Sequence, residues 1–285
     1  MPNFVNGDLR IPHPERILFP QIGLTRRDLV EYYRRMAPPL LTEAGNKPLT
    51  VRRWPHGILG PTFYQKHQPE GGPIRVHTVH ELLRWVGQGV IEWHAPLGST
   101  YRQHEWAVLD LDPEPQASWH DVVAVATMVT TLLREVGWSY VMKTSGQDGL
   151  HIFCPIEPAE PPVVTAVMKY FAELMAAAAP DLVTVERLKS KRQGRVYVDY
   201  LQNGAHRTMV MAYSVRATPD ARISWPLMPD QLSLGPARWT VGWVLDQPPT
   251  SWPPFDGSVL PPAALQDTVR RFGIRAETST AAWKW

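Results

Sequence analysis

Apolar residues recur every three or four positions in several stretches of the chain, which is the spacing of an amphipathic helix. Three of these stretches follow a Ser or Thr that has an acid three residues later: Thr25 with Asp28, Thr78 with Glu81, and Ser118 with Asp121. This pairing satisfies free backbone N–H groups at a helix start and predicts three helices. The third is expected over residues 119–135 with a left-handed stop at Gly137, and a fourth is expected over 163–178, before Pro180.

Short apolar or alternating runs between the helices predict strands. These runs cover residues 91–95, 106–111, 140–143, 150–155, 195–201 and 208–212. The pairs Asp148-Gly149 and Asn203-Gly204 are typical of hairpin turns. From about Leu234 onward, the prolines at 248–249, 253–254 and 261–262 predict a wrapping tail with one short helix over 262–272. Helices and strands mixed in this way predict an α+β fold.

The size and composition of the chain favour a single globular body over residues 1–285, either one large domain or two closely joined halves. No apolar run reaches the roughly 18–20 residues of a membrane span, and the first eight residues lack a secretion signal. We therefore expect a cytoplasmic protein without a membrane partner. The single cysteine, Cys154, excludes an internal disulfide and a cysteine-based zinc site. The formal net charge of +2 does not by itself indicate an anionic partner.

Two acids alternate at the end of one predicted strand, in Leu109-Asp110-Leu111-Asp112-Pro113. Alternate side chains share a face, so Asp110 and Asp112 should lie side by side, about 6.6 Å apart along the backbone. Their repulsion raises one pKa unless a cation offsets it, and Mg²⁺ or Mn²⁺ suits oxygen ligands. An exposed Asp-Pro turn at the end of a strand is the alternative interpretation.

A third carboxylate lies on another predicted strand, where Tyr197 and Asp199 should share a face and Val196 and Val198 should be buried. Three acids can hold two metal ions about 3.5–4 Å apart, the arrangement used in nucleotidyl transfer. The three aspartates are therefore candidate catalytic metal ligands if the two strands meet.

The loop from Lys143 to His151 contains Ser145, Gly146 and Gly149, so its backbone amides and hydroxyl group can approach phosphate oxygens closely. An ordinary glycine hairpin with a satisfied histidine is the alternative.

Three further residues are weaker phosphate or nucleotide candidates: Arg207, Arg216 and His94. The arginines can equally be surface residues, and a lone histidine on an apolar strand is usually structural. The basic run over residues 187–195 is interpreted as a solvated hairpin that could also hold a phosphate backbone.

In this order, eight motifs resemble the polymerase domain of bacterial end-joining ligase D, a branch of the archaeo-eukaryotic primase superfamily. They are Arg16-Ile-Leu-Phe-Pro20, the segment from Gly23 to Tyr33, Arg53-Trp-Pro-His-Gly57, Phe63-Tyr-Gln-Lys66, Asp110-Leu-Asp112-Pro113, Ser145-Gly146 to His151, Val198-Asp-Tyr-Leu-Gln-Asn203 and Tyr213-Ser-Val-Arg216. The resemblance covers nearly the whole chain.

The resemblance implies a primase-polymerase fold, with two sheets, flanking helices and the active site between them. It implies an N-terminal part that contacts DNA ends over about 1–90, a catalytic core over about 91–230 and a C-terminal tail over about 231–285. The implied metal ligands are Asp110, Asp112 and Asp199. The implied nucleotide-binding residues are His94, Ser145, Gly146, His151, Gln202, Arg207 and Arg216, and the implied DNA-binding residues are Arg16, Arg26, Arg53, Phe63, Tyr64 and Lys66.

The activity implied by the resemblance is template-directed nucleotidyl transfer (EC 2.7.7), which extends primers and fills gaps at DNA ends in non-homologous end joining. The expected cofactors are two Mn²⁺ or Mg²⁺ ions with nucleoside triphosphates as substrates, preferably ribonucleotides. Expected partners are DNA with 5′-phosphorylated ends, gaps or overhangs, together with Ku and a separate DNA ligase. A nucleoid-associated monomer is expected.

One departure from the family is Asp148, which stands where the family commonly has a lysine, so Lys143 or Arg207 is expected to supply the charge instead. Two other functions share the implied site. One is a non-catalytic module that binds and bridges DNA ends, and the other is a stand-alone primase that starts chains without a primer.

Overall fold

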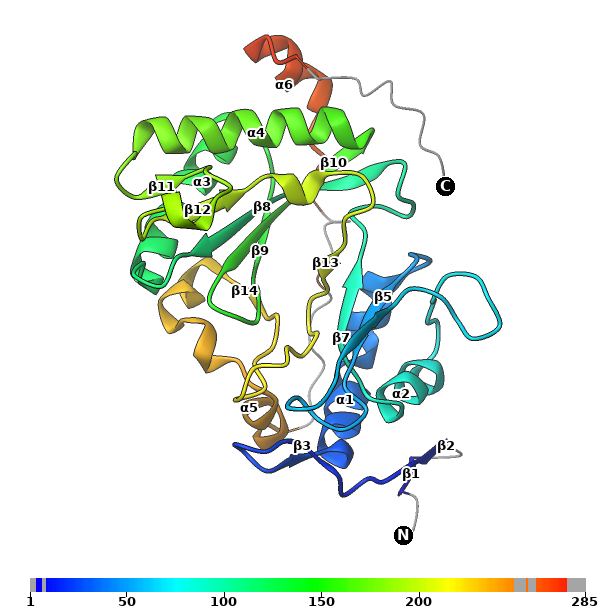
Figure 1. The fold of residues 1–285 in the computed structure, drawn as a ribbon. Coiled ribbons are helices and arrows are strands. Elements are labelled where there is room, and N and C mark those ends of the chain that lie inside the picture. The colour runs from blue at the N-terminus through cyan, green and yellow to red at the C-terminus, as the bar shows by residue number, and fades with distance from the viewer. Residues whose placement is uncertain (1–3, 7–8, 249–254, 256–259, 276–285) are drawn as a thin grey trace. The chain divides into compact units, whose positions relative to one another are not determined.

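The computed structural model describes residues 4–6, 9–248, 255 and 260–275 (Figure 1). The chain forms two compact units that alternate along the sequence. Unit 1 takes its residues from 1–95, 143–148 and 208–256, and unit 2 from 96–142, 149–207 and 257–285. The expected core (91–230) and tail (231–285) each contribute to both units, and the single-domain organisation stays a prediction.

The sheet of unit 1 is antiparallel, with the strand order β13-β7-β5-β6. Its strands are β13 (Met209–Val210), β7 (Val90–Ala95), β5 (Thr50–Arg53) and β6 (Phe63–Gln65). Two small antiparallel pairs precede it: β1 (Phe4–Asn6) with β2 (Leu9–Ile11), and β3 (Ile17–Phe19) with β4 (Leu24–Thr25). Another short strand, β14 (Pro226–Leu227), lies near the end of β9 (Val141–Thr144), where Thr144 N donates to Trp225 O.

The helices of unit 1 are α1 (Arg26–Ala44), α2 (Val79–Gly87) and α5 (Val241–Asp246). The predicted capping boxes at Thr25 and Thr78 are confirmed at the starts of α1 and α2. Two fully buried tyrosines fix α1 to the rest of the unit. The hydroxyl of Tyr33 donates to Ile91 O at 2.5 Å, and that of Tyr32 donates to Tyr213 O at 2.7 Å.

In unit 2, four strands run in the order β11-β12-β8-β10. They are β11 (Val183–Thr184), β12 (Val196–Asp199), β8 (His104–Pro113) and β10 (Leu150–Ala159). Strand β8 is antiparallel to both β12 and β10, whereas β11 is parallel to β12.

The helices α3 (Trp119–Glu135) and α4 (Pro161–Ala178) pack against β8 and against each other, so they cover one face of the sheet (Figure 1). The boundaries of α3 and the end of α4 agree with the sequence prediction. Helix α6 (Leu265–Phe272) contacts α4. None of the helices in the described ranges is both long and apolar enough to cross a membrane.

The predicted hairpin at Asn203-Gly204 is wrong. Asn203 ends the 3₁₀ helix η2 (Leu201–Asn203), and its fully buried amide accepts from Val108 N at 2.8 Å and donates to Val108 O at 2.7 Å. These bonds to the backbone of β8 fix the segment inside unit 2. The next strand, β13, pairs with β7 instead of returning to β12. A local turn signal was therefore overridden by tertiary hydrogen bonds.

The basic run is not a hairpin either. It contains the 3₁₀ helix η1 (Lys189–Lys191) and joins β11 to β12, which are parallel, so this segment is a crossover. The buried Arg192 donates to Glu114 Oε1 at 2.9 Å, and Arg195 donates to backbone carbonyls, whereas Arg187 remains exposed.

The predicted C-terminal helix is confirmed as α6. The prediction missed α5 and two 3₁₀ helices, η3 (Pro229–Leu234) and η4 (Pro236–Arg238), because these elements are too short for a clear periodicity. The rest of the predicted wrapping tail, at 249–254, 256–259 and 276–285, lies outside the described residues.

Candidate active site

The pairing of β8 places the acidic residues on one face of the sheet of unit 2. Asp110 lies directly opposite Asp199 of β12, and Asp112 lies opposite Tyr197. On the other side of β8, His151 of β10 lies opposite Asp110, with its Nε2 3.3 Å from Asp110 Oδ1. Directly opposed residues of an antiparallel pair share a face. The predicted convergence of the three aspartates is therefore present in the backbone register.

The other face of β8 explains why the acids are held there. Leu109 and Leu111 are buried, with 2% and 0% of their surface exposed, on the side covered by helices. Pro113 ends the strand immediately after Asp112, as predicted. Alternation along a strand with one apolar face leaves the carboxylates on the opposite face.

Three donors orient the carboxylate of Asp199. The hydroxyl of Tyr197 and the backbone N–H of Leu201 donate to Oδ1 at 3.2 and 2.9 Å, and Nε2 of Gln202 donates to Oδ2 at 3.0 Å. Gln202, a predicted nucleotide contact, thus holds a predicted metal ligand. Such bonds restrict the rotation of the carboxylate.

The central electrostatic feature is an excess of negative charge at Asp112. Burial, together with the neighbouring Asp110 and Asp199 carboxylates, raises the pKa of Asp112 to about 8, although Arg192 and Lys189 oppose this shift. Near neutral pH, Asp112 therefore holds a proton that a bound cation would displace.

This charge arrangement predicts a pH-dependent affinity for Mn²⁺. Because the proton on Asp112 competes with the cation below about pH 8, we expect Mn²⁺ to bind about tenfold or more weakly at pH 6.5 than at pH 8.5. The folding stability of the metal-free protein should depend on pH in the opposite direction, falling as the pH rises. The raised pKa stabilises the folded state at low pH, and this stability is lost as the pH rises from about 4 toward about 8.

Calorimetric Mn²⁺ titrations and thermal melts at several pH values would test both effects. In Asp112→Asn, which cannot take up this proton, both pH dependences should flatten even though Mn²⁺ binds more weakly. Equal affinity of the wild type at pH 6.5 and 8.5 would contradict the assignment.

The donor set fits a hard divalent cation by its chemistry, because the three side chains are carboxylates and their mutual repulsion is of the kind a cation relieves. Within the described part of the chain, no three His, Cys, Asp or Glu side chains already form a metal-binding group. The register therefore brings the aspartates to one place, and the carboxylates have to turn toward a common ion.

Residues 143–148 of the predicted phosphate loop belong to unit 1, where Arg216 bonds their backbone. Nη1 of Arg216 donates to Ser145 O, and Nη2 donates to Gln147 Oε1, both at 3.2 Å. Gly146 has a φ of +73°, and a Cβ there would lie 2.4 Å from Arg216 Cγ and 2.9 Å from Ser224 N. Only glycine permits this close approach. The structure therefore brings Ser145, Gly146 and Arg216 together.

A buried carboxylate that sequence analysis missed, Glu92, connects two predicted nucleotide contacts. Its Oε2 lies 3.2 Å from His94 Nε2, and its Oε1 accepts from Arg216 Nε at 3.1 Å. Burial alone would raise the pKa of Glu92, but His94, Arg216 and the N–H of Ala217 lower it to about 2. Glu92 is therefore ionised, and His94 must carry its proton on Nε2 to bond it. The Glu-x-His alternation on β7 was the available signal for this pair.

The remaining nucleotide candidates belong to unit 2. His151 and Gln202 belong to unit 2, beside Asp110 and Asp199, and Arg207 is exposed after η2 in the same unit. Lys143, expected to replace the family lysine, is fully buried, and its Nζ donates to Ser224 Oγ at 2.7 Å. It is therefore not accessible to a ligand.

The aromatic DNA-binding candidates form a layer with arginines on β5 and β6. The guanidinium of Arg53 lies 5.2 Å from the ring centre of Phe63, and that of Arg52 lies 5.2 Å from the ring centre of Tyr64. Phe63 and Tyr64 are 46% and 59% exposed, so their rings have surface available for stacking.

The basic DNA-binding candidates differ in exposure. Lys66 is exposed, whereas Arg26 is 3% exposed and donates to the carbonyls of Pro12 and Pro55. Arg16 donates to the same Pro55 carbonyl at 3.0 Å. Burial, together with the charge of Arg16, lowers the pKa of Arg26 to about 10. Arg26 therefore ties loops of unit 1 together, and its contact with DNA stays a prediction.

Comparisons with known proteins agree with this fold. The family model of the LigD primase-polymerase domain matches residues 25–85 and 73–247, so the chain belongs to this family. The structure matches the solved polymerase domain of Mycobacterium tuberculosis ligase D, determined in complex with DNA, with a TM-score of 0.73 at 24% identity. This match covers 93% of the present chain and 94% of that chain. The predicted primase-polymerase fold of the α+β class is confirmed.

Curated relatives are longer than this chain. The multifunctional non-homologous end joining protein LigD of Pseudomonas aeruginosa is 30% identical over 260 residues, which cover 82% of this chain and 30% of the relative. The bifunctional LigD of Bacillus subtilis is 28% identical over 263 residues, covering 85% of this chain and 43% of the relative. The chain thus spans 30% to 43% of the length of these relatives.

Proposed function

We propose that this protein is a template-directed polymerase, a nucleotidyltransferase that extends primers and fills gaps at DNA ends during non-homologous end joining. The observation that carries the proposal is the register of β8 and β12, which places Asp110, Asp112 and Asp199 on one sheet face. In this reaction a primer 3′-hydroxyl attacks the α-phosphate of a nucleoside triphosphate in line, and pyrophosphate leaves. No side-chain nucleophile is needed.

The three aspartates are the proposed ligands of two divalent ions, Mn²⁺ or Mg²⁺. When bound, such ions promote ionisation of the attacking hydroxyl and offset negative charge on the reacting phosphate and the leaving pyrophosphate. The chain itself contributes orientation: Tyr197, Leu201 and Gln202 hold the carboxylate of Asp199. His151, whose Nε2 lies 3.3 Å from Asp110 Oδ1 on the β10 side, is also a proposed nucleotide contact.

The triphosphate is the proposed ligand of Arg216 and of the loop from Lys143 to His151, called the Ser145 loop from here on. His94 is proposed to line the nucleotide pocket, and Arg207 is a further proposed contact. Arg216 is held beside the loop by a buried anion, Glu92, so its guanidinium is fixed before nucleotide binds. Preorganised donors of this kind lose little entropy on binding an anion. A preference for ribonucleotides is proposed from the family resemblance.

DNA is the proposed partner, in the form of 5′-phosphorylated ends, gaps or overhangs. The exposed rings of Phe63 and Tyr64, flanked by arginines, suit stacking of unpaired bases and contacts to the backbone. Arg16, Arg26 and Lys66 are the proposed phosphate contacts. Ku and a separate ligase as partners, a monomeric state and a place at the nucleoid are proposed by analogy with the longer LigD relatives.

A primer-extension assay tests this function. With Mn²⁺, a nucleoside triphosphate and a primed template that carries a 5′-phosphate on its downstream strand, we expect stepwise, template-dependent lengthening. DNA binding without incorporation, whatever the metal or nucleotide, would contradict the proposal and favour an end-bridging module. Products from an unprimed template would instead indicate a primase.

A further inference from the structure

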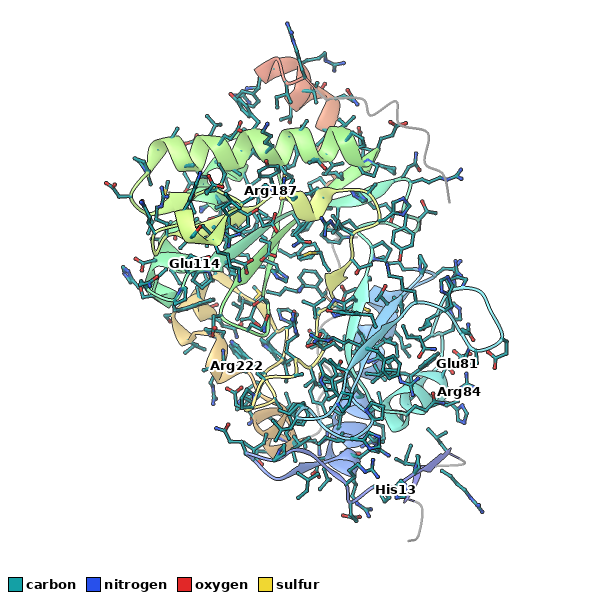
Figure 2. The ribbon with its side chains drawn as sticks, in the orientation of Figure 1. His13, Glu81, Arg84, Glu114, Arg187 and Arg222 are labelled. Atoms are coloured by element: carbon teal, nitrogen blue, oxygen red, sulfur yellow. The ribbon has the colours of Figure 1, made fainter. Side chains whose placement is uncertain are left out.

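Two arginines, Arg216 and Arg222, bond the loop around Ser145. Arg216 bonds the side chain of Gln147, and Arg222 Nη1 donates to the backbone O of the same residue at 3.2 Å. Figure 2 labels Arg222, which sequence analysis did not identify as a candidate. Because both guanidinium groups bond Gln147, they flank one short stretch of loop backbone.

Arg222 is shared between two carboxylates. Its Nε donates to Asp220 Oδ2 at 2.8 Å, and its Nη1 donates to Asp148 Oδ1 at 2.7 Å. The two carboxylates differ in how freely they can move. The Asp148 side chain is 77% exposed, whereas that of Asp220 is 34% exposed. An ion pair with so exposed a partner is weak and exchanges readily.

The charges around the loop do not favour an anion as they stand. Arg216 is neutralised by the buried Glu92, while Arg222 faces both Asp148 and Asp220. The positive charge of Lys143 is buried behind Ser224. A strongly charged phosphate group can therefore gain a cation here most easily by replacing the exposed Asp148 at Arg222.

We propose that Arg222 is a second triphosphate-binding arginine of this chain, and that Asp148 is a carboxylate competitor that occupies it until nucleotide binds. The proposal rests on the proposed function for the identity of the ligand. On nucleotide binding, Asp148 turns into solvent and a phosphate oxygen takes its place on the guanidinium, which remains bonded to Asp220. No covalent bond changes.

Two variants separate competitor from ligand. Asp148→Asn removes the competing charge at an exposed position and should lower the KM for nucleoside triphosphate about threefold to tenfold, with kcat changed less than about twofold. Arg222→Gln should raise this KM about tenfold. In the double variant, Asp148→Asn should have no further effect, because its action passes through Arg222. The control is Arg238→Gln, an exposed arginine of unit 1 that lies over Trp243 and should leave the KM unchanged.

Calorimetric binding of inorganic tripolyphosphate to the full chain, without metal, provides a readout independent of polymerisation. Asp148→Asn should tighten this binding and Arg222→Gln should weaken it by the same factors. If both variants bind tripolyphosphate as the wild type does, Arg222 is only part of a surface ion pair and the inference is overturned. If Arg222→Gln does not fold, Asp148→Asn alone tests the inference, because an unchanged affinity for tripolyphosphate in that variant also overturns the inference.

The two proposals can fail separately. If primer extension is normal and the KM for nucleoside triphosphate is the same in both variants as in the wild type, the polymerase proposal stands and the proposed role of Arg222 is rejected. If the protein binds tripolyphosphate through Arg222 but cannot extend primers, the anion site is supported and the proposed polymerase function is rejected.

Discussion

Replacing Asp110 and Asp112 together with alanine should abolish primer extension, lowering kcat by at least about a thousandfold, since metal ions stabilise the transition state by several kcal/mol. The double substitution removes both aspartates of β8 and leaves only Asp199, on the neighbouring strand β12. The variant should fold at least as well as the wild type, because it removes the buried repulsion that raises the pKa of Asp112. Activity and thermal melting must therefore be measured on the same preparations.

The matched control is Asp181→Ala. Asp181 is an exposed acid of unit 2, outside the paired strands β8 and β12, so its loss removes an aspartate without touching the cluster. Full activity is expected from this control. Retained extension by the double variant would reject the three aspartates as metal ligands, whatever the family relationship.

The second large effect is expected from Glu92→Gln, which keeps the shape of the side chain and removes its charge. The KM for nucleoside triphosphate should rise about tenfold to a hundredfold, because Arg216 and His94 lose the anion that positions them. The variant should also be less stable by about 2 kcal/mol, since a buried, ionised hydrogen-bond partner is lost. Steady-state kinetics that separate KM from kcat, together with denaturant unfolding, would measure both effects.

Glu43→Gln provides the comparison for Glu92→Gln, because Glu43 is a partly buried carboxylate of the same unit. Its carboxylate accepts from Ala212 N at 2.7 Å, and burial raises the pKa of Glu43 to about 7, so it is already partly neutral near physiological pH. Substitution by the neutral Gln should therefore be tolerated and leave the KM unchanged. Equal KM values for Glu92→Gln and the wild type would remove Glu92 from the proposed triphosphate site.

Signals that act over a few residues were readable from sequence. The capping boxes at Thr25, Thr78 and Ser118 predicted three helix starts, because each is completed within one turn. The alternation around Asp110 predicted which side chains share a face, because the period of a strand is fixed by its backbone.

Features that depend on distant contacts were not readable in this way. Asn203 has the local chemistry of a turn, but its amide bonds the backbone of Val108, 95 residues away. Arg222 meets Asp148 across 74 residues, and Arg216 meets Glu92 across 124. Nothing in a single sequence marks these two arginine–carboxylate pairs, so they appeared only in the structure.

The most direct test is the anomalous scattering of Mn²⁺ in crystals grown with a non-hydrolysable nucleoside triphosphate. We predict manganese peaks within about 2.0–2.4 Å of carboxylate oxygens contributed by residues 110, 112 and 199. Manganese bound only to other groups, while these three side chains keep their contacts with the protein, would contradict the assignment of the three aspartates as metal ligands.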